Sequence, residues 1–173
     1  MRRFFILIFT LFTVLYTTAK DKGETTGGFT WGGDVGTTID FSSNGMSTID
    51  ADVNVGYKNK FFRSLCIGVG MHNTLSNGDR MIPVYLLVKT SFTSKPKQLC
   101  FGEVKLGYSF NSIKSETQQG LYCSSGVGFN LYSNEKFKSH LIIAYNFYRM
   151  HKSEKLKRLE NIHCVSIKVG INF

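Results

Sequence analysis

From residue 28 onward, apolar and polar residues alternate along this chain with a period of two. Such alternation is typical of β-strands whose two faces meet different surroundings, and no 3.6-residue helical period competes with it. The pattern predicts eight strands, at Phe29–Phe41, Met46–Tyr57, Phe62–Asn73, Met81–Phe92, Gln98–Asn111, Gln119–Tyr132, Lys136–Met150 and Glu160–Phe173.

The segments between these strands also alternate, in length. Short connections at 58–60, 93–97 and 133–135 are interleaved with mostly longer ones at 42–45, 74–80, 112–119 and 151–159. An up-and-down barrel with tight periplasmic turns and longer extracellular loops gives this alternation. An even number of strands places both ends of the barrel at the periplasmic side. The predicted fold class is therefore all-β, an eight-stranded antiparallel up-and-down transmembrane β-barrel.

The first 19 residues are typical of a secretory signal peptide. Two arginines follow Met1, the run Phe4–Tyr16 is apolar, and small residues precede a cleavage point after Ala19. The alternative is an uncleaved membrane anchor, for which the apolar run is short because a spanning helix needs about 20 residues. We therefore expect a cleaved signal peptide at 1–19 and one barrel domain at 20–173.

Alternation alone does not say which face of the barrel is outside, because a soluble lipocalin-like barrel shows the same pattern inside out. The polar face is rich in glycine, which a narrow lumen needs and a water-facing strand does not. It also carries charges of both signs. Buried charges must be paired, so we predict a lumen charge network of Asp34, Asp50, Asp52, Lys89, Glu103, Lys105 and Lys168. A solvated face of a soluble barrel is the alternative for these residues.

The cysteines and the composition predict no cofactor and no metal site. Cys66, Cys100, Cys123 and Cys164 fall inside predicted strands, two on each face, and we expect them to be free thiols. No Cys-x-x-Cys or Cys/His spacing typical of metal ligands occurs. The net charge of +9 could indicate nucleic-acid binding. The export signal and the lack of a recognition module argue against it.

The last eleven residues, HCVSIKVGINF, place apolar residues at every second position and finish on an aromatic. In this the chain resembles small outer-membrane β-barrels of the OmpA/OmpX type and related short barrels common in Bacteroidetes. The resemblance implies an outer-membrane location in a Gram-negative bacterium and insertion by the barrel-assembly machinery, which reads the last strand. The family often has an aromatic third from the end, where this chain has Ile171. The implied assembly signal is Val165, Ile167, Val169, Ile171 and Phe173.

Barrels of this family do not share one activity, so function has to be argued from residues. His151 and Ser153, with Glu160 as a third member, are similar to the His-x-Ser pair of outer-membrane lipid A deacylases, but they fall in a charged loop. A channel is disfavoured because side chains can fill an eight-stranded lumen. Ligand capture in a soluble barrel would need an apolar cavity. We expect no catalysis, and a structural, anchoring or surface-interaction role for a monomer.

Basic residues gather at the predicted periplasmic end, where Glu135 is the only acid. Beside lipid head groups, long lysine and arginine side chains can lie along apolar surface while their charges meet phosphates. Ordinary interfacial anchoring without a dedicated partner is the alternative. We therefore predict outer-membrane lipid as a partner of a basic periplasmic rim formed by Lys58, Lys60, Arg63, Lys95, Lys97, Lys136 and Lys138.

Overall fold

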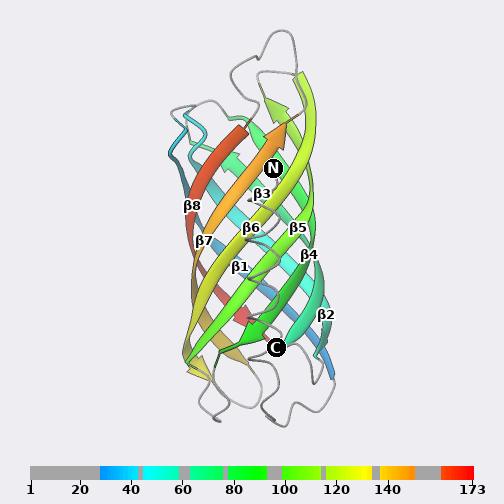
Figure 1. Cartoon of the computed structure of the whole chain (residues 1–173), viewed down its shortest axis with the longest axis vertical. Coiled ribbons are helices and arrows are strands. Elements are labelled where there is room, and N and C mark those ends of the chain that lie inside the picture. The colour runs from blue at the N-terminus through cyan, green and yellow to red at the C-terminus, as the bar shows by residue number, and fades with distance from the viewer. Residues whose placement is uncertain are drawn as a thin grey trace, which may run out of the picture.

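A computed structural model shows one closed, eight-stranded antiparallel barrel, in which each strand pairs with its neighbour along the chain and the last pairs with the first (Figure 1). The structure describes residues 28–42, 45–58, 63–75, 78–92, 99–113, 116–133, 137–150 and 161–173. The strands are β1 (Gly28–Asp40), β2 (Thr48–Lys58), β3 (Ser64–Thr74), β4 (Arg80–Ser91), β5 (Cys100–Ile113), β6 (Glu116–Ser133), β7 (Lys138–Met150) and β8 (Asn161–Asn172).

The fold class predicted from the sequence is confirmed, and no strand end differs from its prediction by more than three residues. The barrel closes where β1 pairs with β8, from Gly32 opposite Asn172 to Asp40 opposite Cys164. We call the end where β1 begins and β8 ends the lower end, as in Figure 1, and the opposite end the upper end. Within the described residues no helix is long and apolar enough to cross a membrane.

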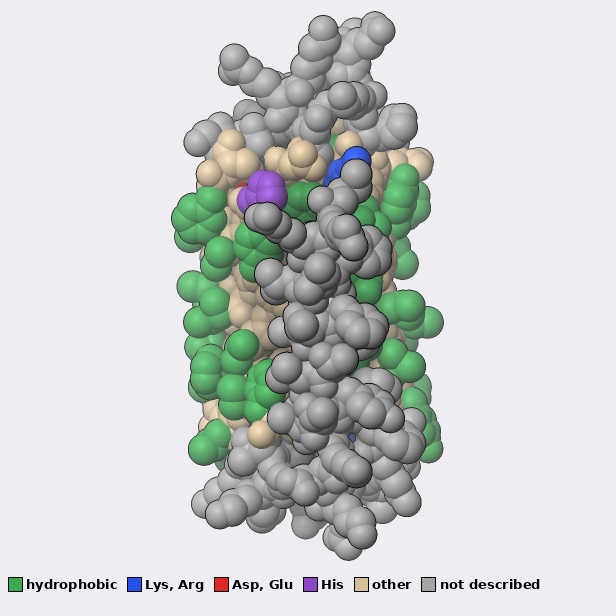
Figure 2. All heavy atoms as spheres, viewed as in Figure 1, with side chains coloured by type: hydrophobic (Ala, Val, Ile, Leu, Met, Phe, Trp, Pro, Cys, Tyr) green, Lys and Arg blue, Asp and Glu red, His purple; other side chains and the backbone are tan. Residues whose placement is uncertain are grey.

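The alternation separates two surfaces of the barrel wall. Large apolar side chains of all eight strands are exposed on the outside, and Figure 2 shows them along both flanks of the visible face. The alternate residues point inward and are buried. Cys66 and Cys164 face the lumen, Cys100 and Cys123 lie on the outer parity, and all four are free thiols.

The predicted alternation of short and long connections fails at 92–99 and at 114–115. The lower end has connections 59–63, 92–99 and 134–137, and the upper end has 41–47, 75–79, 114–115 and 151–160. The shortest lies at the end expected to carry long loops. The segment 112–119 looked like a loop because it is polar, yet Ser112 pairs with Thr117 and Ile113 with Glu116. Paired strands satisfy their backbone N–H and C=O groups whatever their side chains are. β5 and β6 therefore continue through polar sequence.

Two local irregularities interrupt the regular pairing. Pro83 has no backbone N–H to donate, and the β3–β4 pairing omits the positions between Val69–Val84 and His72–Met81. A register shift lies between Asn130 and Tyr132 of β6, where it pairs with β7. The upper-end connections contain Gly45 and Gly78 with φ of 70° and 68°, a conformation that favours glycine.

Candidate functional site in the barrel lumen

The candidate site is the set of charged side chains inside the barrel. Each of the seven residues predicted for the lumen charge network is at most 2% exposed. They come from five strands, β1, β2, β4, β5 and β8. Alternation forces this placement because each lies on the inward parity of its strand.

Asp52 of β2 is the centre of the network. Its Oδ2 accepts hydrogen bonds from Lys168 Nζ at 2.7 Å and from Lys105 Nζ at 3.4 Å. Its other oxygen lies 3.2 Å from Nε2 of His72. One carboxylate therefore joins side chains from β3, β5 and β8, which the sequence separates widely but the closed wall brings together.

Asp50 lies two residues before Asp52 on the same face of β2. The hydroxyls of Thr38 and Thr48 each donate to it at 2.5 Å. Lys168 Nζ lies 2.9 Å from its Oδ2, so this one ammonium bridges the two aspartates. Because the lone pairs of both aspartates are engaged, these buried charges meet the requirement for pairing.

The remaining predicted charges lie nearer the lower end. Glu103 lies between two lysines, 3.8 Å from Lys105 and 3.9 Å from Lys89. Asp34 pairs with Nε2 of His140 at 2.7 Å. Counting only the predicted residues, four carboxylates face three lysines. Each of these carboxylates therefore lies beside at least one lysine or histidine side chain of the lumen.

Sequence reasoning missed the two histidines and three tyrosines that complete this network. His72 Nδ1 lies 2.7 Å from the hydroxyl of Tyr148, and the rings of Tyr122 and Tyr148 are 4.9 Å apart. Tyr85 continues the stack, 5.9 Å from Tyr122. All five residues share the parity of the predicted lumen charges, so extending the parity rule to every residue type would have found them.

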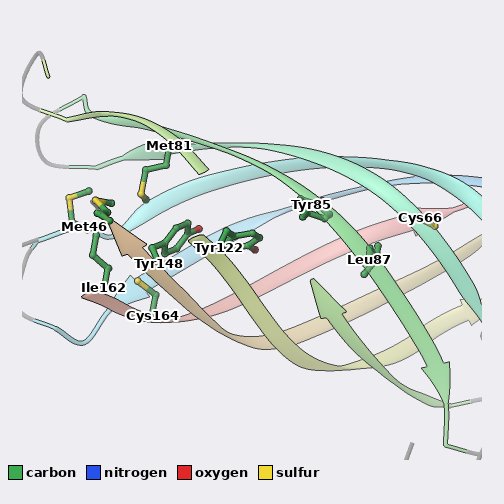
Figure 3. Packing of buried hydrophobic residues seen from close by; sticks show 10 residues of the cluster. Met46, Cys66, Met81, Tyr85, Leu87, Tyr122, Tyr148, Ile162 and Cys164 are labelled. Carbon is green, nitrogen blue, oxygen red and sulfur yellow. The ribbon is translucent and has the colours of Figure 1, made fainter. Parts of the chain in front are cut away.

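Apolar side chains cover the network towards both ends. Near the lower end, Phe101 is fully buried over Gly128, which lies opposite it on β6. Towards the upper end, Met46 and Met81 gather with Tyr148 and Ile162, as Figure 3 shows. The charged layer therefore lies between two layers of apolar and aromatic side chains.

The residues of the implied assembly signal lie on the outer parity of β8 and just beyond it. Ile167, Val169, Ile171 and Phe173 are 41–49% exposed. The Phe173 ring stacks on Trp31 of β1 at 4.3 Å, and its backbone N–H donates to the Trp31 carbonyl at 2.9 Å. These contacts extend the β1–β8 pairing past the end of β8.

The basic rim and the hydrolase hypothesis are only partly within the described residues. Lys58, Arg63 and Lys138 lie at the lower end of the barrel. Lys60, Lys95, Lys97 and Lys136 lie outside the described residues, as do the signal peptide at 1–19 and His151, Ser153 and Glu160. Within the described residues, no group of three or more His, Cys, Asp or Glu side chains is arranged to hold a metal ion.

Comparison with known proteins supports the architecture. No protein-family model and no curated protein sequence matches the chain. Among solved structures, it is similar to Neisserial surface protein A, with a TM-score of 0.58 at 13% identity over 86% of this chain and 98% of that one. It is also similar to the N-terminal β-barrel domain of Pseudomonas aeruginosa OprF, with a TM-score of 0.52 at 12% identity over 86% and 100%. The chain therefore shares with these two structures the fold of a closed antiparallel β-barrel.

Proposed function

We propose that this chain is an outer-membrane β-barrel with a structural, anchoring or surface-interaction role, whose lumen is closed by its own charge network. The observation that carries the proposal is the inverted distribution of side chains. Ile67, Leu86, Leu106 and Ile167 are 46–60% exposed on the outer wall. The lumen instead holds carboxylates, lysines and histidines.

A closed barrel with this distribution fits a lipid bilayer. Every strand has a paired neighbour on each side, so the wall offers hydrocarbon no open edge of backbone N–H and C=O groups. Each strand has at least 11 residues, enough for a tilted β-strand to cross the hydrocarbon core. In water, the same wall would expose an apolar surface far larger than monomeric proteins tolerate.

The soluble alternative, a lipocalin-like barrel, needs the reverse arrangement. Such a barrel binds its ligand in an apolar interior and presents polar residues to water. Here the interior is polar, and its carboxylates and lysines engage one another. The apolar layers around Phe101 and Met81 cover them on both sides. The same covering argues against a conducting pore and against chemistry at the lumen carboxylates, since neither an ion nor a substrate has a described path to them.

The proposal is tested by extraction and gel mobility. We expect the protein to fractionate with the outer membrane and to resist extraction from it by alkaline carbonate. We also expect faster migration in detergent gels before boiling than after it, because folded barrels resist unfolding by detergent. Recovery from the soluble periplasmic fraction, with no mobility shift on heating, would support the lipocalin-like alternative instead.

An arginine at Ile167, midway along β8, distinguishes lipid from water outside the barrel. In a bilayer, Ile167→Arg is expected to lower the free energy of unfolding by about 2–4 kcal/mol, because a charge near the midplane of the lipid face is costly. Leu75→Arg, just beyond the upper end of β3, is the matched control, with an expected loss of about 0–1 kcal/mol.

The measurement is denaturant unfolding of each variant in lipid vesicles. In a soluble barrel both positions would face water, and both changes would fall within about 0.5 kcal/mol of wild type. Equal effects at the two positions would therefore contradict a membrane-spanning wall.

A further inference from the structure

Three cationic side chains gather at the mouth of the lumen, the opening at the lower end of the barrel. Lys58 is the last residue of β2 and shares the inward parity of Asp52. Lys138 is the first residue of β7 and shares the inward parity of His140. Arg63 lies directly before β3. All three are half-buried, so they neither extend freely into solvent nor lie sealed within the charge network. We call them the mouth cations.

The side chain of Arg63 crosses the mouth. Its guanidinium lies 4.5 Å above the centre of the Phe101 ring of β5 and donates to the Asn130 side-chain oxygen of β6 at 3.0 Å. β3 and β6 are not neighbours in the closed wall, so Arg63 links two separate parts of it. Its other terminal nitrogen, Nη1, is buried without a hydrogen-bond partner among the described residues. A buried cationic donor without an acceptor is costly, and an anion would remove that cost.

The two lysines converge on the end of β8. Lys58 donates across β1 to the main-chain oxygen of Phe173, at 3.4 Å, and Phe173 directly follows β8. Lys138 pairs with Asn172, the residue before Phe173. The charges of Lys58 and Arg63 both act on Lys138. Because an eight-stranded lumen is only about as wide as the side chains that fill it, long side chains from these three strands reach one shared space.

The positive charge of the mouth has no acidic counterpart among the described residues. There, none of the mouth cations forms an ion pair with an aspartate or glutamate side chain. In the sequence of the three lower-end connections, Glu135 is the only acid, against the four lysines Lys60, Lys95, Lys97 and Lys136. Like charges held together in a confined space repel one another, and a bound anion would offset this repulsion.

We propose that Lys58, Arg63 and Lys138 form an anion-binding site at the mouth of the lumen, which takes a phosphate-sized tetrahedral oxyanion. Phe101 and Asn130 fix the guanidinium of Arg63, whose planar fork of donors matches an oxyanion better than a halide. The site lies on the lower side of Phe101, outside the charge network that closes the lumen. The inference goes beyond the proposed function and rests on the closed barrel rather than on the bilayer.

Calorimetric titration with inorganic phosphate tests the site. The protein is folded in micelles of a non-ionic detergent, which carry no phosphate, and phosphate replaces chloride at constant ionic strength and neutral pH. We expect saturable binding of one phosphate per barrel, with competition by sulfate, which has the same shape, and not by an equal concentration of chloride. Phosphate should also raise the denaturant midpoint, because a ligand that binds only the folded state stabilises it.

Removing the mouth cations should weaken this binding. A charge-assisted hydrogen bond corresponds to about tenfold in affinity. Lys58→Gln/Lys138→Gln, which keeps the packed Arg63, should therefore weaken phosphate binding by about tenfold or more. Arg63→Lys keeps the net charge but loses the planar fork, and should reduce the preference for phosphate over chloride. Arg80→Gln/Arg149→Gln, at the upper end, is the matched control and should bind phosphate as the wild type does. Heat-modifiable mobility shows that each variant is folded.

A further titration separates a soluble anion from a lipid head group. Glycerol phosphate should displace inorganic phosphate, whereas phosphatidylglycerol added to the micelles should not, because the mouth cations face inward and acyl chains lie on the outer wall. Displacement by phosphatidylglycerol alone would assign the cations to a lipid and overturn the site.

Three other results would also overturn the site. They are no saturable binding in the wild type, competition by chloride as strong as that by sulfate, and equal weakening in the control and mouth variants. Each of them leaves the membrane location standing, since carbonate extraction and the Ile167→Arg variant test that location without phosphate.

Discussion

Replacing Asp52 with asparagine is expected to lower the free energy of unfolding by about 3–5 kcal/mol. The amide fills the same space but carries no charge. Lys105 and Lys168, both at most 2% exposed, would each lose an acceptor at 3.4 Å and 2.7 Å. Lys168 keeps Asp50 and Lys105 keeps Glu103, but each of these two buried ammonium groups loses one of its carboxylate partners. The measurement is denaturant unfolding of the barrel in lipid vesicles.

A second substitution tests whether the loss comes from charge. Lys105→Met in the Asp52→Asn background removes one of the two lysines that lost an acceptor and keeps an unbranched side chain of comparable length. The double variant should recover most of the lost stability, because replacing both partners of a buried pair is far less costly than removing one. If the two single losses simply add, or if Asp52→Asn costs less than about 1 kcal/mol, Asp52 is not the centre of a charge-balanced network.

Substitutions at Gly128 and Phe101 are also expected to lower the free energy of unfolding strongly. The two residues lie directly opposite each other on β6 and β5, and a Cβ at residue 128 would overlap the Phe101 ring. Gly128→Leu should therefore destabilise the barrel by about 1–3 kcal/mol through overpacking. Phe101→Ala should destabilise it by about 3–5 kcal/mol by leaving a cavity near the lower end.

The double variant gives the decisive outcome. Leucine at 128 can occupy the space that Phe101 leaves, so Phe101→Ala/Gly128→Leu should be more stable than Phe101→Ala alone. Ala51→Leu, which adds volume on the outward side of β2, is the control and should change the free energy of unfolding by less than about 0.5 kcal/mol. Additive losses at 101 and 128 would show that the two side chains do not share one space.

Much of the fold could be predicted because alternation carries two kinds of information. It gives the number of strands, and its parity assigns each residue to one face. Asp34 and Lys168, far apart in the sequence, were both placed inside in this way, and both are buried. Connection lengths were predicted less well, since the polar residues of 112–119 do not reveal that the strands continue through them.

Which charges meet could not be predicted, because parity does not give register. Lys168 reaches Asp52 only because closure of the barrel sets β8 against β1 with Gly170 opposite Asp34. A shift of two residues along that seam would keep every residue on its face and change the partners. The pattern also does not reveal a residue whose polarity differs from that of its face. Phe101 is apolar but lies on the polar parity, so its place inside the barrel was not expected.

The pairing of β1 with β8 sets the order in which the barrel can form. Seven strand pairs join neighbours along the chain, and this one joins its two ends, with the Thr30–Phe173 hydrogen bond spanning 143 residues. Contacts between distant residues form late because loop-closure entropy must be overcome first. Until then both terminal strands have unpaired edges that could join other chains. The stacking of Trp31 on Phe173 therefore stabilises the strand pair that closes the barrel.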